Sequence, residues 1–387
     1  MPFADDPYPF PNVNATSDAK ALANVLKSTL TSNVQSILPK KYPIVSAGQR
    51  ADPVMVPFSM LLVAGPAGSH VYAGVNDDSM CFSASLLKVA VMYAAMELFA
   101  GANRVAPKVS VSSGETPTDA LLSALGSAFD KGLAGGPTRK LNAVTPNTPA
   151  WEDIFEMDLG PPQTAKFVQA FSSDLDLMVR LSDDDAAARC IDKMGFAYIN
   201  VALANGGFFH HGGPADDHGI WITGDYAALE IIPRPVQTVN DGGGKLVMNT
   251  AAMLKMFALI LGGSLVDATS CHEMQLALIA AKSALVPLII HADDPANTTP
   301  VTVPFAVLMS KYGYDKIGRP GHWGDTVYSE CSVLQWSASD TDTINALKAM
   351  KLSDTLIICW QNFRQQRFKS FDKIRQIVIN TVTQFVA

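Results

Sequence analysis

One of the two longest apolar runs in the chain lies just before residue 100. Val89 to Phe99 reads Val-Ala-Val-Met-Tyr-Ala-Ala-Met-Glu-Leu-Phe and has almost no polar face. A helix that is apolar on every side belongs inside a protein rather than on its surface. The pattern therefore predicts a core helix, and it predicts that Lys88, at the start of this helix, is buried.

Elsewhere the pattern is more mixed. Hydrophobic spacing predicts helices over Asp119–Asp130 and Thr164–Arg180, and a β-rich run over Ser329–Trp336. Alternating helical and strand signals over 387 residues, with 48% hydrophobic residues, predict one large folded unit that mixes helices with strands.

The predicted core helix begins with a pair of residues that could carry chemistry. Ser85-Leu86-Leu87-Lys88 places a hydroxyl and an amine one helical turn apart. Burial lowers the pKa of a lysine, so the free amine of Lys88 could take the proton of Ser85. Ser17–Lys20 and Ser370–Lys373 have the same spacing, but they lie in polar segments where the lysine would be solvated.

Two later segments add to this pair. Ser182-Asp183-Asp184 follows the helix predicted to end at Arg180, and its acidic residues could equally cap the next helix. Lys316-Ile317-Gly318 precedes the β-rich run, and Lys311-Tyr312-Gly313 is a competing copy five residues earlier.

Ser-x-x-Lys, then Ser-Asp-x, then Lys-x-Gly, in that order, resembles the serine β-lactamases and penicillin-binding proteins, most closely the class A branch. The likeness covers about two thirds of the chain. It includes an opening hairpin, the helix that contains the Ser-Asp motif, two helices before the Lys-x-Gly strand, a last strand and a C-terminal helix. These segments are Leu61–Gly74, Met178–Phe196, Asn249–Gly263, Leu265–Lys282, Thr355–Gln361 and about Phe363–Phe385.

The resemblance implies an α+β fold, with an antiparallel sheet flanked by helices, a mainly helical lobe, and the active site between them. We expect one fold over residues 1–387. Residues 1–80 and 300–387 would form the α/β lobe, and 81–299 the helical lobe. Extra segments are expected near 106–163 and 281–304.

The resemblance also implies roles for individual residues. Ser85 is expected to be the acylated nucleophile, Lys88 its general base, and Ser182 the hydroxyl that relays the proton to the leaving group. Lys316 would hold Ser182 in place. The backbone N–H groups of Ser85 and Arg319 would form the oxyanion hole.

Departures from the family pattern affect the reaction. Asp184 stands where the family has asparagine, and beside Lys88 it should favour the ammonium. Ile317 stands where the family has a hydroxyl that helps to bind a substrate carboxylate, and Arg319 could compensate. The residues expected to contact substrate are Ile317, Gly318, Arg319 and His322.

The family's Glu-x-x-Leu-Asn loop, whose glutamate activates the deacylating water, has no counterpart in the sequence. Glu230 lies at about the right distance before the Asn249 helix, and it is the candidate for this role. An esterase, a peptidase and an acyltransferase therefore remain alternatives to a β-lactamase.

Charge and composition restrict the partners. A net charge of −7 disfavours nucleic acid and anionic membranes, and the apolar runs are too short or too interrupted to span a bilayer. The start of the chain predicts a cytoplasmic or an already processed protein. Nothing in the motifs calls for a cofactor, and the oligomeric state stays open.

Neither the cysteines nor the histidines form a pattern that favours a metal site. Five cysteines without a CxxC pair predict buried free thiols. His210 to His218 contains metal-ligand types, but its Gly-Pro composition favours a loop at the mouth of the cleft.

The sequence therefore predicts an enzyme that forms an acyl-enzyme on Ser85 with an ester, amide or lactam. The alternative is a catalytically silent protein that kept the fold and binds a ligand or partner.

Overall fold

The structure is a computed structural model. It describes residues 6–10, 12–38, 42–46, 49–133, 149–210, 217–224, 236, 238–239, 246–292, 300–317, 325–361 and 371–387.

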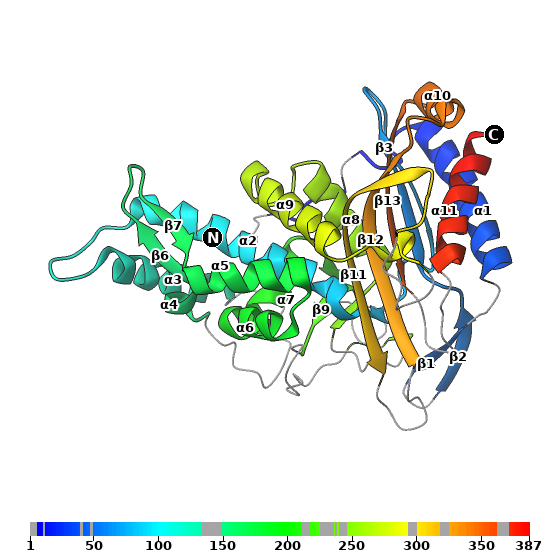
Figure 1. The fold of residues 1–387 in the computed structure, drawn as a ribbon. Coiled ribbons are helices and arrows are strands. Elements are labelled where there is room, and N and C mark those ends of the chain that lie inside the picture. Colours follow the sequence, from blue (N-terminus) through cyan, green and yellow to red (C-terminus); the bar gives the residue numbers. More distant parts are fainter. Residues whose placement is uncertain are drawn as a thin grey trace.

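A five-stranded antiparallel sheet forms the centre of the fold (Figure 1). Its order is β11-β12-β13-β3-β4, so strands from both ends of the chain lie side by side. The strands are β3 (Phe58–Ala64), β4 (Val71–Val75), β11 (Phe305–Ile317), β12 (Asp325–Trp336) and β13 (Leu352–Gln361). The predicted opening hairpin is β3 and β4, and the predicted last strand lies within β13.

Two amphipathic helices cover one face of this sheet. They are α1 (Ser17–Ile37) and α11 (Phe371–Val386), which run side by side on the right of Figure 1. Leu26 and Leu30 of α1 and Ile374 of α11 are fully buried in a cluster that includes Trp360 of β13. The short helix α10 (Thr341–Ala349) joins β12 to β13 at the edge of this layer.

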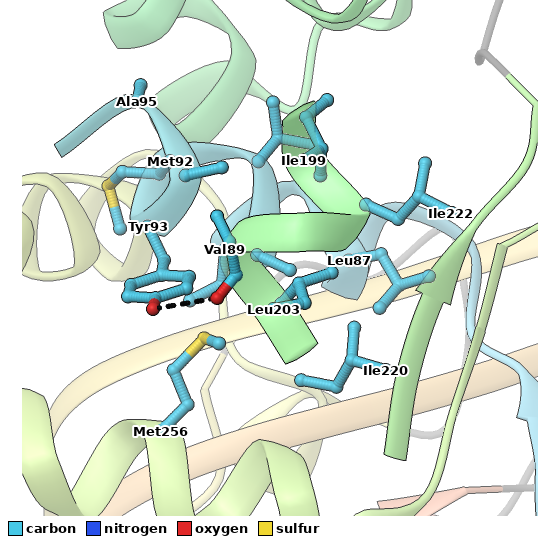
Figure 2. Packing of buried hydrophobic residues seen from close by; sticks show 14 of the residues in the cluster. Leu87, Val89, Met92, Tyr93, Ala95, Ile199, Leu203, Ile220, Ile222 and Met256 are labelled. Carbon is cyan, nitrogen blue, oxygen red and sulfur yellow. Dashed lines mark hydrogen bonds between the residues drawn. The ribbon is translucent and has the colours of Figure 1, made fainter. Parts of the chain in front are cut away.

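A larger apolar cluster lies on the other side of the sheet. Its centre is α2 (Lys88–Val105), preceded by the 3-10 turn η1 (Ala84–Leu87). Figure 2 shows Val89 and Met92 of α2 facing Ile199 of α7 (Phe196–Asn205) and Met256 of α8 (Thr250–Leu261). The prediction of an internal apolar helix is confirmed, since 13 of the 18 residues of α2 are buried.

The rest of this region is made of short elements around α2. They are η2 (Ala106–Lys108), α3 (Pro117–Leu133), α4 (Trp151–Ile154), β6 (Phe155–Asp158), β7 (Thr164–Phe167), α5 (Gln169–Asp176), α6 (Asp184–Met194) and α9 (Ala268–Ala284). The 3-10 turn η5 (Leu288–Ile290) packs instead against α11, in the cluster on the other side of the sheet. A four-stranded sheet has the order β5-β10-β9-β8, from Cys81–Phe82, Leu246–Met248, His218–Ile222 and Phe209–His210. A separate hairpin pairs β1 (Tyr42–Ser46) with β2 (Gln49–Val54).

One predicted helix begins later than the sequence pattern indicates. The segment Thr164–Arg180 starts as strand β7, which pairs with β6, and only then becomes helical. The aromatic rings of Phe155 and Phe167 stack across this hairpin with centroids 5.3 Å apart, so tertiary packing overrides the helical pattern. After α5 the chain continues as a π-helical turn over Leu177–Leu181.

Most other expected segments match. Asp119–Asp130 lies within α3, and α8 and α9 are the two helices before β11. The predicted division into two lobes, and the extra segments expected near 106–163 and 281–304, stay predictions. The five cysteines are buried free thiols, as predicted.

Within the part of the chain that the structure describes, two helical segments are long and apolar enough, by length and composition alone, to cross a bilayer: 84–108 and 268–290. The first is the core segment around α2, 83% buried, so its role in the core accounts for its hydropathy.

Candidate active site

Ser85 lies at a sharp entry into the core helix. It belongs to η1, directly before α2, and is half-buried. The preceding Ala84 has a φ of +47°, in the left-handed region that residues other than glycine rarely adopt. Strained backbone of this kind is common at functional sites, where surrounding structure holds it in place.

Strand β11 passes very close to this turn at Gly313. A Cβ added to Gly313 would lie 2.6 Å from the backbone nitrogens of Ser85 and Leu86, and 2.6 Å from the carbonyl oxygen of Ser83. Only glycine allows this approach, because backbone atoms cannot move aside cheaply. The edge of β11 is therefore held against the residue predicted to be the nucleophile.

Lys88 is fully buried, as predicted. Its Nζ donates hydrogen bonds of 2.5 Å to the carbonyl oxygen of Ser182 and 2.5 Å to Oδ1 of Asp184. Burial lowers the pKa of Lys88, and the hydrogen bond and charge of Asp184 oppose that shift. The expectation that Asp184 would lie beside Lys88 and favour its ammonium form is confirmed.

Ser182 also adopts an unusual backbone. It ends the π-helical turn with a φ of +61°, and its hydroxyl and its carbonyl oxygen each accept a hydrogen bond from a different lysine. The sequence left two roles open for the acids after Ser182, capping of the next helix and membership of the site, and each role is filled by a different residue. Asp183 caps α6 by accepting from the N–H of Ala186 at 2.7 Å, while Asp184 pairs with Lys88.

The lysine that holds Ser182 is Lys311, and the prediction of Lys316 is corrected. Lys311 Nζ donates to Ser182 Oγ at 3.0 Å and to the carbonyl oxygen of Val179 at 2.7 Å. Lys316 lies opposite Thr326, five residues further along β11, which is about 16 Å of extended strand. The earlier Lys-Tyr-Gly copy, which includes Gly313, is the one at the site.

Lys311 is almost completely buried, with 2% of its surface exposed. Burial, together with the nearby charge of Lys88, lowers the pKa of Lys311 to about 7. Two buried amines therefore contact Ser182, Lys311 at its hydroxyl and Lys88 at its carbonyl oxygen, and each has a pKa below that of an exposed lysine.

Ser85, Ser182 and Asp184 line a cavity of about 560 Å³. This volume falls in the range of small-molecule sites. The residues that line it are Ser85, Leu181, Ser182, Asp184, Leu285, Tyr312, Tyr314 and Asp315. Leu181, Leu285, Tyr314 and Asp315 were not predicted, because they belong to no motif. Tyr312 was not predicted because it belongs to the Lys-x-Gly copy that the sequence analysis did not select.

The structure gives no side-chain position for five other predicted site residues. Ile317 ends β11, and only its backbone position is described. The others, Glu230, Gly318, Arg319 and His322, lie outside the described residues.

The histidines lie apart from Ser85. His210 and His218 are opposite each other in β8 and β9, with ring centroids 4.8 Å apart. They line a second cavity, whereas the sequence favoured a loop at the mouth of the cleft that holds Ser85. Residues 211–216 lie outside the described part. Within the described residues, no group of three or more acidic, histidine or cysteine side chains could hold a metal ion.

Comparison with known proteins gives matches in structure. No protein-family model matches the chain, and no curated protein matches its sequence. Among solved structures, the TLA-1 extended-spectrum β-lactamase has a TM-score of 0.51 at 10% identity, with 93% of this chain and 99% of that chain covered. The TLA-3 extended-spectrum β-lactamase has a TM-score of 0.51 at 10% identity, covering 93% and 100%. The chain therefore has the fold of the serine β-lactamases, as its motif order predicts, in a sequence that has diverged far from these two enzymes.

Proposed function

We propose that the protein is an acyl-serine enzyme, with Ser85 as the nucleophile toward an ester, amide or lactam. The observation that carries this proposal is the contact of Lys311 with the Ser182 hydroxyl, beside Ser85 in one cavity. Lys88 reaches the backbone of the same serine. Two costly buried amines that both contact Ser182, one at its hydroxyl and one at its backbone carbonyl, are hard to explain as packing, because burying lysine destabilises its charged form.

In the proposed reaction, the Ser85 oxygen attacks the carbonyl carbon and its proton passes to the amine of Lys88. The C–O bond to Ser85 forms and the bond to the leaving group breaks. Ser182 delivers a proton to the leaving group and receives in exchange the proton that Lys88 took from Ser85, and Lys311 stabilises the charge that develops on Ser182 during this transfer. Water or another nucleophile then releases the acyl group.

Backbone donors would stabilise the oxyanion. The N–H of Ser85 is one candidate, since it lies beside Gly313 at the edge of β11. The residue after Lys311-Tyr312-Gly313 is Tyr314, which lines the cavity. Its N–H, rather than that of Arg319, is therefore the second donor to the oxyanion. A single donor of this kind contributes about 3 kcal/mol to transition-state stabilisation.

One observation favours the alternative of a catalytically silent binding protein. The ion pair of Lys88 with Asp184 stabilises the ammonium, which cannot accept the proton of Ser85. Burial lowers the pKa of Lys88 and the ion pair raises it, so the balance of the two effects decides whether Lys88 can act as a base.

Intact-mass measurement after exposure to a fluorophosphonate, and separately to a penicillin, tests the proposal. We expect an adduct on the wild type and none on Ser85→Ala. Ser17→Ala is the matched control, because Ser17-Asp18-Ala19-Lys20 has the same spacing on the surface of α1. A folded wild type that neither reagent labels would instead support the silent binding protein.

A further inference from the structure

A second cavity, of about 480 Å³, is separate from the cavity at Ser85, and the described residues that line the two cavities are different. Its walls come from the N-terminal segment, β4, the turn between α7 and β8, β9 and the start of α8. The proposed function assigns no role to this cavity. It contains the two histidines that the sequence analysis singled out.

Aromatic rings form the walls of this second cavity, and packing fixes them. Phe10 meets Tyr72 edge-on, with centroids 5.8 Å apart. Phe208 packs on Tyr93 at 5.1 Å, and Phe209 on Trp221 at 4.4 Å. Such walls suit a flat, apolar ligand, because their shape exists before the ligand binds.

Lys255 brings a positive charge to these walls. It is half-buried, its Nζ donates to the carbonyl oxygen of Gly207 at 3.2 Å, and it lies 5.1 Å above the ring of Phe208. Burial lowers the pKa of Lys255. An ammonium has three donors, so one carbonyl leaves capacity for an anion.

The other polar groups around the cavity agree with an anionic ligand. His210 and His218 are exposed on their strands, and imidazole rings can donate hydrogen bonds to a carboxylate. Among the described residues that line the cavity, Asp77 is the one acidic side chain, and it already accepts a hydrogen bond from the hydroxyl of Tyr72.

We propose that this second cavity binds a small molecule with an aromatic body and a single carboxylate. The aromatic body lies between Phe10, Phe208 and Phe209, and the carboxylate pairs with Lys255. The imidazoles of His210 and His218 supply further donors.

Calorimetric titration of the full chain with 2-naphthoate, and with its neutral isostere 2-naphthamide, tests this assignment. We expect 2-naphthoate to bind at least 10-fold more tightly than the amide. The preference should persist in Ser85→Ala, which separates this cavity from the Ser85 site. It should also persist in Lys348→Met, a lysine-to-methionine control on the exposed surface of α10.

Lys255→Met should abolish the preference for the carboxylate, and Lys255→Arg should retain most of it. If Lys255→Met does not fold, a matching loss of preference in the wild type at high salt serves the same purpose, because screening weakens a half-exposed ion pair. Equal affinity for the two probes, no binding of either, or a preference that survives Lys255→Met would each overturn the proposal.

Discussion

At the scale of single residues, the choice between two lysines five positions apart decides how the site is organised. Lys311 contacts the Ser182 hydroxyl, so Lys311→Met should slow fluorophosphonate labelling of Ser85 by about 100-fold, the usual cost of one lost electrostatic contact. Lys316→Met is the matched control and should change the rate less than 3-fold. Rates come from intact mass against time, and the reverse order of the two variants would restore Lys316 to the site.

A second residue-scale prediction concerns Asp184, which favours the ammonium of Lys88. Asp184→Asn removes the charge that opposes burial, so the pKa of Lys88 should fall further and more free amine should exist near neutral pH. In a plot of labelling rate against pH, the rise on the acidic side should shift to lower pH by about one unit, which corresponds to the loss of one charged hydrogen bond.

The control for this change is Asp185→Asn, an exposed neighbour on α6. A pH profile that does not move in Asp184→Asn, or that moves equally in both variants, would argue against Lys88 as the base.

At the scale of elements, the approach of β11 to the η1 turn depends on Gly313. Gly313→Ala would place a methyl group 2.6 Å from backbone atoms, so we expect a loss of about 1–3 kcal/mol in the free energy of unfolding and slower labelling of Ser85. Urea titration measures the first effect. Gly126→Ala, on α3, is the control: its nearest neighbour would be 3.9 Å away, and helix propensity predicts equal or higher stability.

Most elements could be predicted from the sequence, and the exceptions have physical causes. The core helix and the β3–β4 hairpin carry strong local patterns. The start of β7 could not be predicted, since the stacking of Phe155 on Phe167 depends on a partner strand.

The site was predicted in part. Lys88 contacts Ser182 and Asp184, and Ser85 lines the same cavity, as the resemblance implies, but two copies of Lys-x-Gly look alike in sequence. The signal that separates them is position: Lys311 lies in the middle of a 13-residue strand, whereas Lys316 lies near its end.

At the scale of the whole molecule, one buried acid couples stability to pH. Glu330 is fully buried in β12, where it accepts hydrogen bonds from Ser310, Ser332 and the N–H of Ile289. Burial nevertheless raises its pKa to about 7. The unfolded chain therefore releases this proton at lower pH than the folded protein, and stability contributed by Glu330 falls as pH rises from about 4 to about 7.

Urea unfolding at pH 5 and pH 8 should show this loss, of at most about 3 kcal/mol for one group. Glu330→Gln should reduce the difference between the two pH values. Glu273→Gln, on the exposed side of α9, should leave it as in the wild type. An unchanged pH dependence in Glu330→Gln would assign the effect to other groups.

The order of strands in the central sheet has a consequence for how the protein is made. β3 pairs with β4 on one side and with β13 on the other, although β13 follows almost 290 residues later. A ribosome delivers β3 early, so its open edge waits until nearly all of the chain has been synthesised. During that interval the exposed edge invites pairing with other chains. We expect a nascent chain halted before residue 352 to need a chaperone to stay soluble, even though it already contains Ser85, Ser182 and Lys311.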